Sequence, residues 1–226
     1  MLFRSATVVQ ALAGCLSCNP DLRTAIVEHR FALLLLTVGP LTVAGGFLTA
    51  RIACLVVRVI EHGRWYAQPH HLAWAAALMG AGAGGLGDSI VLHQVLQVHD
   101  MISNSLPPVT LVDKGVNVFW SGVFDLAALV VLLLGIASFW RYSRRFPTMP
   151  SRFFWGALLF GAGGFTCFDV MVFHALLRYH DLVEASAASG LWNTAWWLVG
   201  AVTVVVGIVL IRSGLRLEAV RRASGP

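Results

Sequence analysis

Hydrophobic residues in this chain gather into five long runs separated by short polar or charged connections. The runs cover residues 31–50 or beyond, 72–98, 116–140, 153–179 and 191–211. Each comes near the roughly 20 apolar residues that an α-helix needs to cross a bilayer. Because a backbone facing lipid must satisfy its own polar groups, the runs predict helices rather than strands. We expect an all-α fold, a polytopic transmembrane bundle of about five helices.

The composition agrees with a membrane protein and argues against nucleic-acid binding. Hydrophobic residues make up 58% of the 226 residues, and charged residues only 12%. The net charge of +5 comes mostly from arginines at the ends of the apolar runs, not from an extended basic face. The lipid bilayer is therefore an expected partner, and nucleic acid is not.

The arginines also indicate the orientation of the helices. They are concentrated in the connections 51–71 and 141–152 and in the tail after residue 211, whereas the charged residues of 99–115 and 181–190 are Asp100, Asp113, Lys114, Asp181 and Glu184. The positive-inside rule places the arginine-rich segments, and with them the C-terminus, in the cytoplasm. We expect a multi-pass protein of the bacterial inner membrane.

Residues 1–30 lack a convincing apolar run and are expected to form a non-spanning leader. The sequence LAGC at residues 12–15 resembles the end of a lipoprotein signal, so a lipidated Cys15 is an alternative to an amphipathic or disordered leader. Cys15 and Cys18 also form a lone C-x-x-C pair, which is a weak signal for a metal or redox site.

An internal repeat appears when the chain is aligned with itself at an offset of 81 residues. Apolar matches between membrane helices are common, but matches of ionisable residues are not. The aligned pairs include Gly80 and Gly161, Asp88 and Asp169, His93 and His174, His99 and His180, and Asp100 and Asp181. Each repeat begins on the same side of the membrane, which predicts parallel repeats about a pseudo-twofold axis along the membrane normal.

The repeat also extends into the next helix, where Asn117 and Trp120 correspond to Asn193 and Trp196. Each unit is therefore two helices joined by a loop. The expected organisation is a leader at 1–30, a first membrane helix with its connection at 31–71, repeat units at 72–140 and 153–212, an arginine-rich loop at 141–152 and a basic tail at 213–226.

Charged groups inside a membrane are costly and usually mark a functional path, which singles out Asp88 and Asp169. In a straight α-helix of about 100° and 1.5 Å per residue, His93 is turned by about 140° from Asp88 and lies about 9 Å below His99. One helix is then not expected to give both His93 and His99 to one ion.

Two matched helices at the pseudo-twofold axis are instead expected to build layers. His93 with His174 forms one layer, and His99 with His180 forms an outer layer that also holds Asp100 and Asp181. Together these layers form a polar track that runs from the outer face toward the bilayer centre.

Imidazole and carboxylate groups together suit copper, zinc or iron, and we favour copper. The expected ligands are His93, His99, His174, His180, Asp88 and Asp169, with Asp100, Asp181, Gln94, Gln97 and Asp125 in supporting positions. Alternatives are a proton or ion transporter that uses Asp88 and Asp169 as relay groups, a membrane haem protein with axial histidines, and a purely structural polar interface. No nucleophile with an adjacent base stands out, so an enzyme is not the favoured interpretation.

The segments GDSIVLHQVLQVHDMIS and CFDVMVFHALLRYHD resemble the bacterial membrane-protein family catalogued as domain of unknown function 2243. The similarity covers about residues 72–212 and is carried in the first motif by Asp88, His93, Gln94, Gln97 and His99.

This chain departs from the family pattern as well. The family tends to have a second histidine at the positions of Asp100 and Asp181, and a second motif richer in histidine than this one, at Phe173 and Ala175. The segment NVFWSGVFDLA resembles a family segment that tends to carry an acid and a histidine near Ser121 and Asp125.

The resemblance implies a small polytopic inner-membrane protein associated with copper-oxidase assembly. A respiratory-oxidase or metal-handling protein is the corresponding partner, and a homo-oligomer is an open alternative.

Overall fold

The computed structural model describes residue 16 and residues 19–61, 69–144, 149–184 and 186–223. Within these ranges the chain forms α-helices, two π-helical segments and no strand. In chain order the elements are α2 (Pro20–Glu28), α3 (Phe31–Glu61), α4 (Pro69–Asp88), η1 (Ser89–Val95), α5 (Leu111–Ser143), α6 (Ser151–Asp169), η2 (Val170–Leu176) and α7 (Ser189–Ala223).

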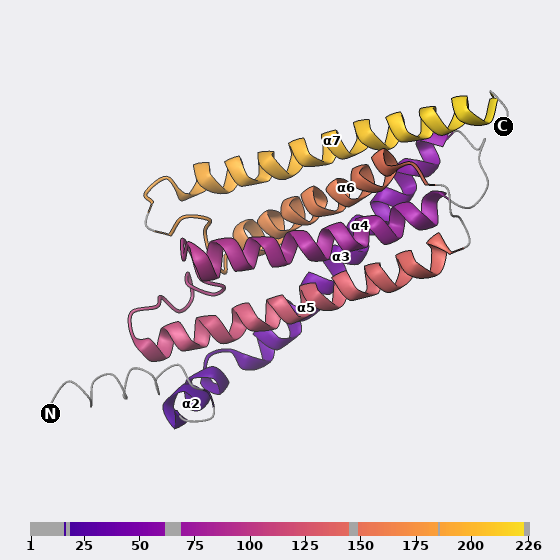
Figure 1. Cartoon of the computed structure of the whole chain (residues 1–226). Helices are drawn as coiled ribbons and strands as arrows, with labels where there is room; N and C mark the ends of the chain where they lie inside the picture. Colours follow the sequence, from indigo (N-terminus) through magenta and orange to yellow (C-terminus); the bar gives the residue numbers. More distant parts are fainter. Residues whose placement is uncertain (1–15, 17–18, 62–68, 145–148, 185, 224–226) are drawn as a thin grey trace, which may run out of the picture.

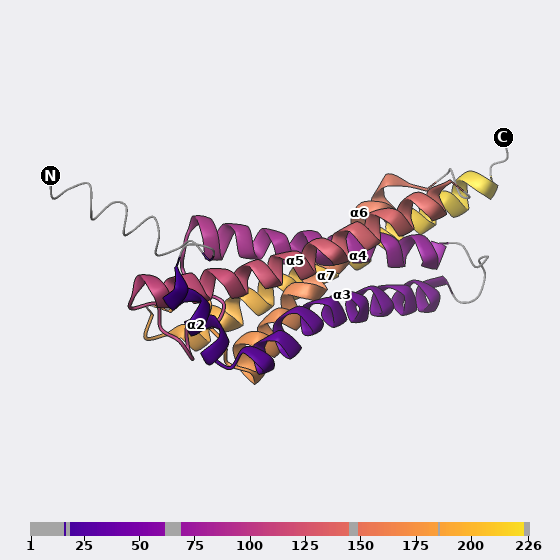
Figure 2. The same ribbon diagram turned by 90° about the horizontal axis from the view of Figure 1, so that it is seen from below.

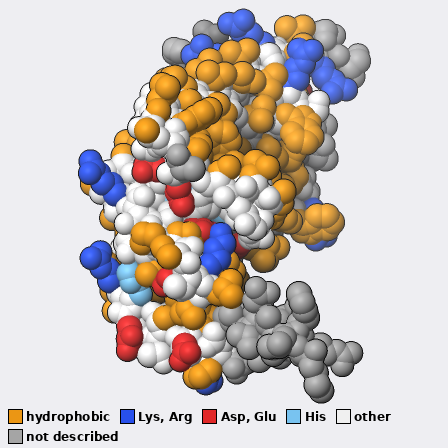
Figure 3. All heavy atoms as spheres, turned by 90° about the vertical axis from the view of Figure 1, so that its left-hand side faces the viewer, with side chains coloured by type: hydrophobic (Ala, Val, Ile, Leu, Met, Phe, Trp, Pro, Cys, Tyr) orange, Lys and Arg blue, Asp and Glu red, His pale blue; other side chains and the backbone are white. Residues whose placement is uncertain are grey.

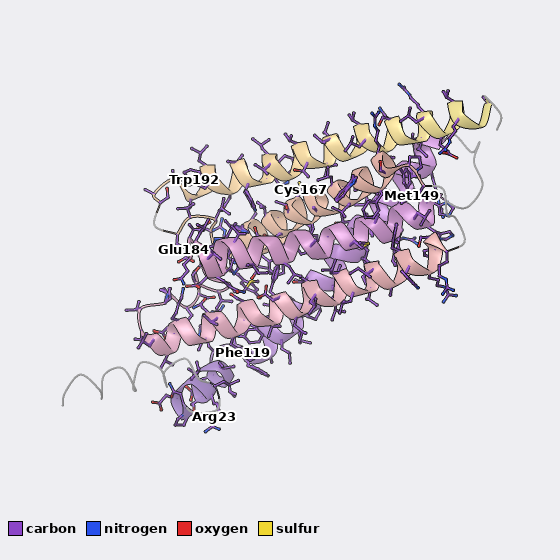
Figure 4. All side chains as sticks on the ribbon, in the orientation of Figure 1. Arg23, Phe119, Met149, Cys167, Glu184 and Trp192 are labelled. Atoms are coloured by element: carbon purple, nitrogen blue, oxygen red, sulfur yellow. The ribbon has the colours of Figure 1, made fainter. Side chains whose placement is uncertain are left out.

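Five of the described helices, α3 to α7, are long and apolar enough to cross a membrane. They lie roughly side by side in one elongated bundle (Figures 1 and 2). The predicted all-α polytopic bundle is therefore confirmed. We call the end with loops 96–110 and 177–184 the histidine end; the opposite end, where α4 and α6 begin, is the arginine end. In Figure 4, Glu184 and Trp192 mark the histidine end and Met149 the arginine end.

Helices α4 and α6 form the centre of the bundle. Half of the residues in their most apolar stretches are buried, compared with 28% for α3 and α5 and 17% for α7. The outer helices present large exposed apolar side chains, such as Leu36, Leu126 and Val202, which suits a surface in contact with lipid. The two central helices are the first helices of the two repeats.

Glycines allow α4 and α6 to touch along their backbones. A Cβ atom added to Gly80 would collide with the carbonyl oxygen of Leu158, and one added to Gly161 would collide with the carbonyl oxygen of Ala77. Leu158 and Ala77 are themselves 81 residues apart, so each contact is the pseudo-twofold image of the other. The repeat seen in the sequence is thus a symmetric helix pair, held at a distance that only small residues permit.

The short helix α2 precedes the bundle and lies against α5. The Asn19 side chain accepts hydrogen bonds from the backbone N–H groups of Asp21 and Leu22, which caps the helix. Leu22 and Ile26, four residues apart, are buried. With 9 residues, α2 is far shorter than the roughly 20 residues of a membrane span. Cys15 and Cys18, with the proposed lipidation, lie outside the described residues.

The predicted helices 72–98 and 153–179 differ from the structure in their last ten or so residues, near the histidine end. In both repeats the α-helix ends at the aspartate, Asp88 or Asp169, and continues as a seven-residue π-helix. The backbone N–H groups of Leu96 and Leu177 donate to carbonyl oxygens five residues earlier, at 2.8 Å in each case. A π-helix widens the turn by one residue and often occurs at functional sites.

The chain then reverses direction at matching positions of the two repeats. Gln97 and Arg178 have φ angles of 49° and 51°, in the left-handed region that residues other than glycine seldom adopt. The next backbone N–H groups, of Val98 and Tyr179, donate to carbonyl oxygens six residues earlier. As a result, His99 and His180 fold back toward the helices instead of extending them.

The α4–α6 contact predicts that replacing different glycines of α4 by alanine has different effects on stability. Gly80→Ala should lower the melting temperature of the detergent-purified protein by several degrees, because overpacking a close contact costs about 1–3 kcal/mol. Gly87→Ala is the matched control, since a Cβ there meets nothing within 4 Å. Equal melting temperatures for the two variants would contradict the close contact.

Candidate metal centre

The π-helices bring each aspartate next to the histidine five residues later. Oδ2 of Asp169 lies 3.2 Å from Nε2 of His174, and Oδ2 of Asp88 lies 3.9 Å from Nε2 of His93. The predicted turn of about 140° between Asp88 and His93 is wrong, because it assumed α-helical geometry. In a π-helix the backbone hydrogen bonds join residues five apart, so such residues share one side.

The four histidines gather into one cluster rather than two layers. The rings of His99 and His180 are stacked, with centroids 4.7 Å apart and planes at 7°. His93 lies 4.3 Å from His99, and His174 lies 4.2 Å from His180, both edge-on. The expectation that His93 and His99 are too far apart to serve one ion is therefore wrong, since the chain reversal after each π-helix removes the separation along the helix.

The stacked pair is oriented by reciprocal hydrogen bonds between the two repeats. Nδ1 of His99 lies 2.9 Å from the carbonyl oxygen of Leu182, and Nδ1 of His180 lies 3.0 Å from that of Met101. A carbonyl oxygen only accepts, so Nδ1 of each ring carries the proton and donates it. In the neutral ring, Nε2 then has a free lone pair.

The other two histidines are oriented by side chains of α5 and α7. Nδ1 of His93 lies 3.2 Å from Oγ of Ser121. Nδ1 of His174 lies 3.2 Å from Oδ1 of Asn193, which also accepts from the Leu182 N–H at 2.7 Å. Asn193 thus links the His174 ring to Leu182, whose carbonyl oxygen accepts the hydrogen bond from His99. Ser121 lies ten residues into α5, about 15 Å from its beginning. His93 and His174 thus belong to the candidate spans, whereas His99 and His180 belong to the loops beyond them.

Three of the four Nε2 atoms have no hydrogen-bond partner among the described residues. Nε2 of His93, His99 and His180 is buried and accepts no hydrogen bond from any of the described residues. Donor atoms of these three residues lie within 4.8 Å of one another, as do those of a second group, Asp169, His174 and His180. Both groups have residue types that could hold a metal ion.

Burial keeps the stacked histidines neutral. It lowers the pKa of His99 from 6.5 to about 3, with a further lowering from His174 and an opposing effect of the hydrogen bond to Leu182. Burial, followed by the neighbouring histidines, lowers the pKa of His180 well below 6.5. Neutral imidazole is the form that binds metals, so both rings are ready to act as ligands.

The acids predicted to support the site in the outer layer have other partners. Both carboxylate oxygens of Asp100 accept from Nζ of Lys114 at 2.8 Å. Oδ1 of Asp181 accepts from the amide of Asn193 at 2.7 Å, and Oδ2 from that of Asn104 at 3.4 Å. Figure 3 looks onto this end, where acidic and basic groups are visible but little of any histidine is. The acids stabilise the loops that cover the cluster.

Gln94, Gln97 and Asp125 form a separate group on the outside of the first repeat. The Gln94 amide donates to Oδ2 of Asp125 at 2.6 Å, and the exposed Gln97 donates to the Gln94 carbonyl at 3.4 Å. The structure does not bring these residues into either donor group.

Sequence reasoning missed several residues that orient the predicted ligands. Nε1 of Trp196 donates to Oδ1 of Asp88 at 3.1 Å, so the second repeat holds the aspartate of the first. The repeated Asn-x-x-Trp pattern was a signal for Trp196 and Asn193. Ser121 and the carbonyl groups of Met101 and Leu182 had no such signal, since any residue has a carbonyl group.

Comparison with known proteins places these residues within one family match. The model of the family described as "Predicted membrane protein (DUF2243)" matches residues 75–214, more than half of the chain. No curated protein and no solved structure matches the chain. The match includes both aspartates and all four histidines of the cluster.

The low pKa values of His99 and His180 predict a protein that acid destabilises. The unfolded chain takes up protons near pH 6.5 while the folded chain does not, so the stabilisation is complete above this pH and declines as pH falls toward 3. The melting temperature of chelator-treated protein should therefore fall as pH is lowered below 6.5. This slope should shrink in His99→Gln but not in His71→Gln, which replaces an exposed histidine stacked on Tyr142. The same slope in both variants would exclude His99 as a cause.

Proposed function

We propose that this chain, which belongs to the DUF2243 family of predicted membrane proteins, binds a transition-metal ion in the histidine cluster. Copper is the metal that we favour. The arginine-rich connections favour an orientation with the histidine end outside the cytoplasm. The proposed place is the outer half of a bacterial inner membrane, and the proposed role is metal handling or assembly of a respiratory oxidase.

A single observation carries the proposal: the buried Nε2 atoms of His93, His99 and His180 have no hydrogen-bond partner in the part of the chain that the structure describes. A buried polar group without a hydrogen bond costs about 1–3 kcal/mol. In the stacked pair Nδ1 donates to a main-chain carbonyl, the usual arrangement of a histidine whose other nitrogen binds a metal. Three such costs at one point are explained by a ligand that all three nitrogen atoms share.

A purely structural role suits these atoms less well. A histidine that only fixes helix packing gains from pairing both ring nitrogens, as His174 does with Asn193 and Asp169. In the other three rings only Nδ1 forms a hydrogen bond to the described residues, and Nε2 of His93 lies 3.9 Å from Oδ2 of Asp88. Nε2 of these three rings is therefore available to an ion, whereas Nε2 of His174 becomes available only when its hydrogen bond to Asp169 is broken.

The donor set favours copper and argues against haem. Imidazole ligands suit copper, zinc and iron, and divalent copper binds a given nitrogen site most tightly of the three. Two axial ligands of haem must face each other across a porphyrin. His99 and His180 instead stack in parallel at 4.7 Å, and the other two histidines pack against their edges.

Metal analysis of the purified protein tests the proposal. Protein expressed with added copper, zinc or iron should retain about one ion per chain, with copper preferred. The double variant His93→Ala, His174→Ala should lose it, because it removes one ligand from each donor group. His71→Ala, at the opposite end of α4, is the control and should keep the ion. Wild-type protein without stoichiometric metal under all three conditions would refute the proposal.

Ser121 offers a second test, directed at an orienting residue. Ser121→Ala removes the hydroxyl beside Nδ1 of His93 and should weaken metal binding about tenfold, the lower end of the range for such partners. Ser143→Ala removes a hydroxyl at the far end of the same helix and should not change the affinity. Competition with a chromophoric chelator measures both, and equal affinities would exclude a role of Ser121.

A further inference from the structure

The two donor groups of the cluster share one residue. His93, His99 and His180 form the first group, and Asp169, His174 and His180 form the second. The stacked rings of His99 and His180 lie at the centre of the cluster, with His93 beside His99 and His174 beside His180. The cluster therefore offers two overlapping sets of donor atoms, each of which defines a candidate ion position.

His180 is able to complete only one position at a time. Its Nδ1 proton is donated to the carbonyl oxygen of Met101, so Nε2 supplies its single free lone pair. An ion that takes this lone pair in the first group leaves the second group with Asp169 and His174 alone. Full occupation of one position excludes full occupation of the other.

The two positions differ in chemistry and in depth. The first offers three nitrogen atoms, none of which has a hydrogen-bond partner among the described residues. The second includes a carboxylate, to which Nε2 of His174 donates a proton at 3.2 Å. An ion entering this position has to displace that proton, which is released as the ion binds, while Nδ1 keeps its proton toward Asn193. Asp169 precedes His174 by five residues on an element that runs toward the histidine end, so the second position extends deeper into the bundle.

We propose that one transition-metal ion moves between these positions and keeps His180 as a ligand throughout, in an inward step from a three-histidine site to a site that contains Asp169. The inference rests on the proposed function. In this step the ion gives up His93 and His99 and gains His174 and Asp169, the Nε2 proton of His174 is released, and the shared histidine prevents release of the ion.

Copper bound to matched variants tests the two positions. Asp169→Asn should confine the ion to the first position, and His93→Ala to the second. Each variant should still bind about one copper ion per chain. Electron paramagnetic resonance should show a nitrogen-only ligand set in Asp169→Asn, a nitrogen and oxygen set in His93→Ala, and a superposition of both in the wild type. His180→Ala should lose affinity by a larger factor than either variant.

Controls separate this inference from the binding itself. Asp21→Asn makes the same change at an exposed acid on α2, outside both donor groups, and should leave the wild-type spectrum unchanged. His93→Gln replaces His93→Ala if the latter fails gel filtration as a folded species. Two copper ions per wild-type chain, or a wild-type spectrum in both Asp169→Asn and His93→Ala, would overturn the two positions and leave metal binding intact. Wild-type protein without copper would overturn the proposed function and this inference together.

Discussion

The close backbone contact of α4 and α6 is the constraint on which the rest of the structure depends. Short side chains such as those of aspartate and histidine meet across two helices only when the helix axes are near each other, and Gly80 and Gly161 allow that approach. The contact also fixes the register of the two repeats. Gly80 lies against Leu158 and Gly161 against Ala77, and Ala77 and Leu158 are corresponding residues of the two repeats. The π-helices and the loops beyond them are then brought face to face.

The bundle is symmetric in its backbone and asymmetric in its polar partners. Both repeats have the π-helix, the left-handed residue and the inward-folded histidine at corresponding positions. Asp88, however, is held by Trp196, whereas Asp169 is held by His174 of its own repeat. A duplicated framework thus provides the geometry, and a few side-chain differences make its two halves chemically distinct.

Much of this architecture could be predicted from the sequence. Apolar runs indicate membrane helices directly, and the offset of 81 identified the paired Asp88 and Asp169 and the four histidines that the structure brings together. The spatial relation of Asp88 to His93 could not be predicted, because a π-helix has no periodicity of its own over seven residues. The reversals at Gln97 and Arg178 were hidden too, since left-handed positions usually contain glycine.

The reciprocal bonds from His99 to Leu182 and from His180 to Met101 also bear on how such a protein is assembled. Each imidazole takes its orientation from the main chain of the opposite repeat, so neither unit holds an ordered stacked histidine alone. In terms of subunits, the cluster is an isologous dimer interface contained within one polypeptide. A protein with a single such unit would complete the same cluster only by pairing with a second copy of itself.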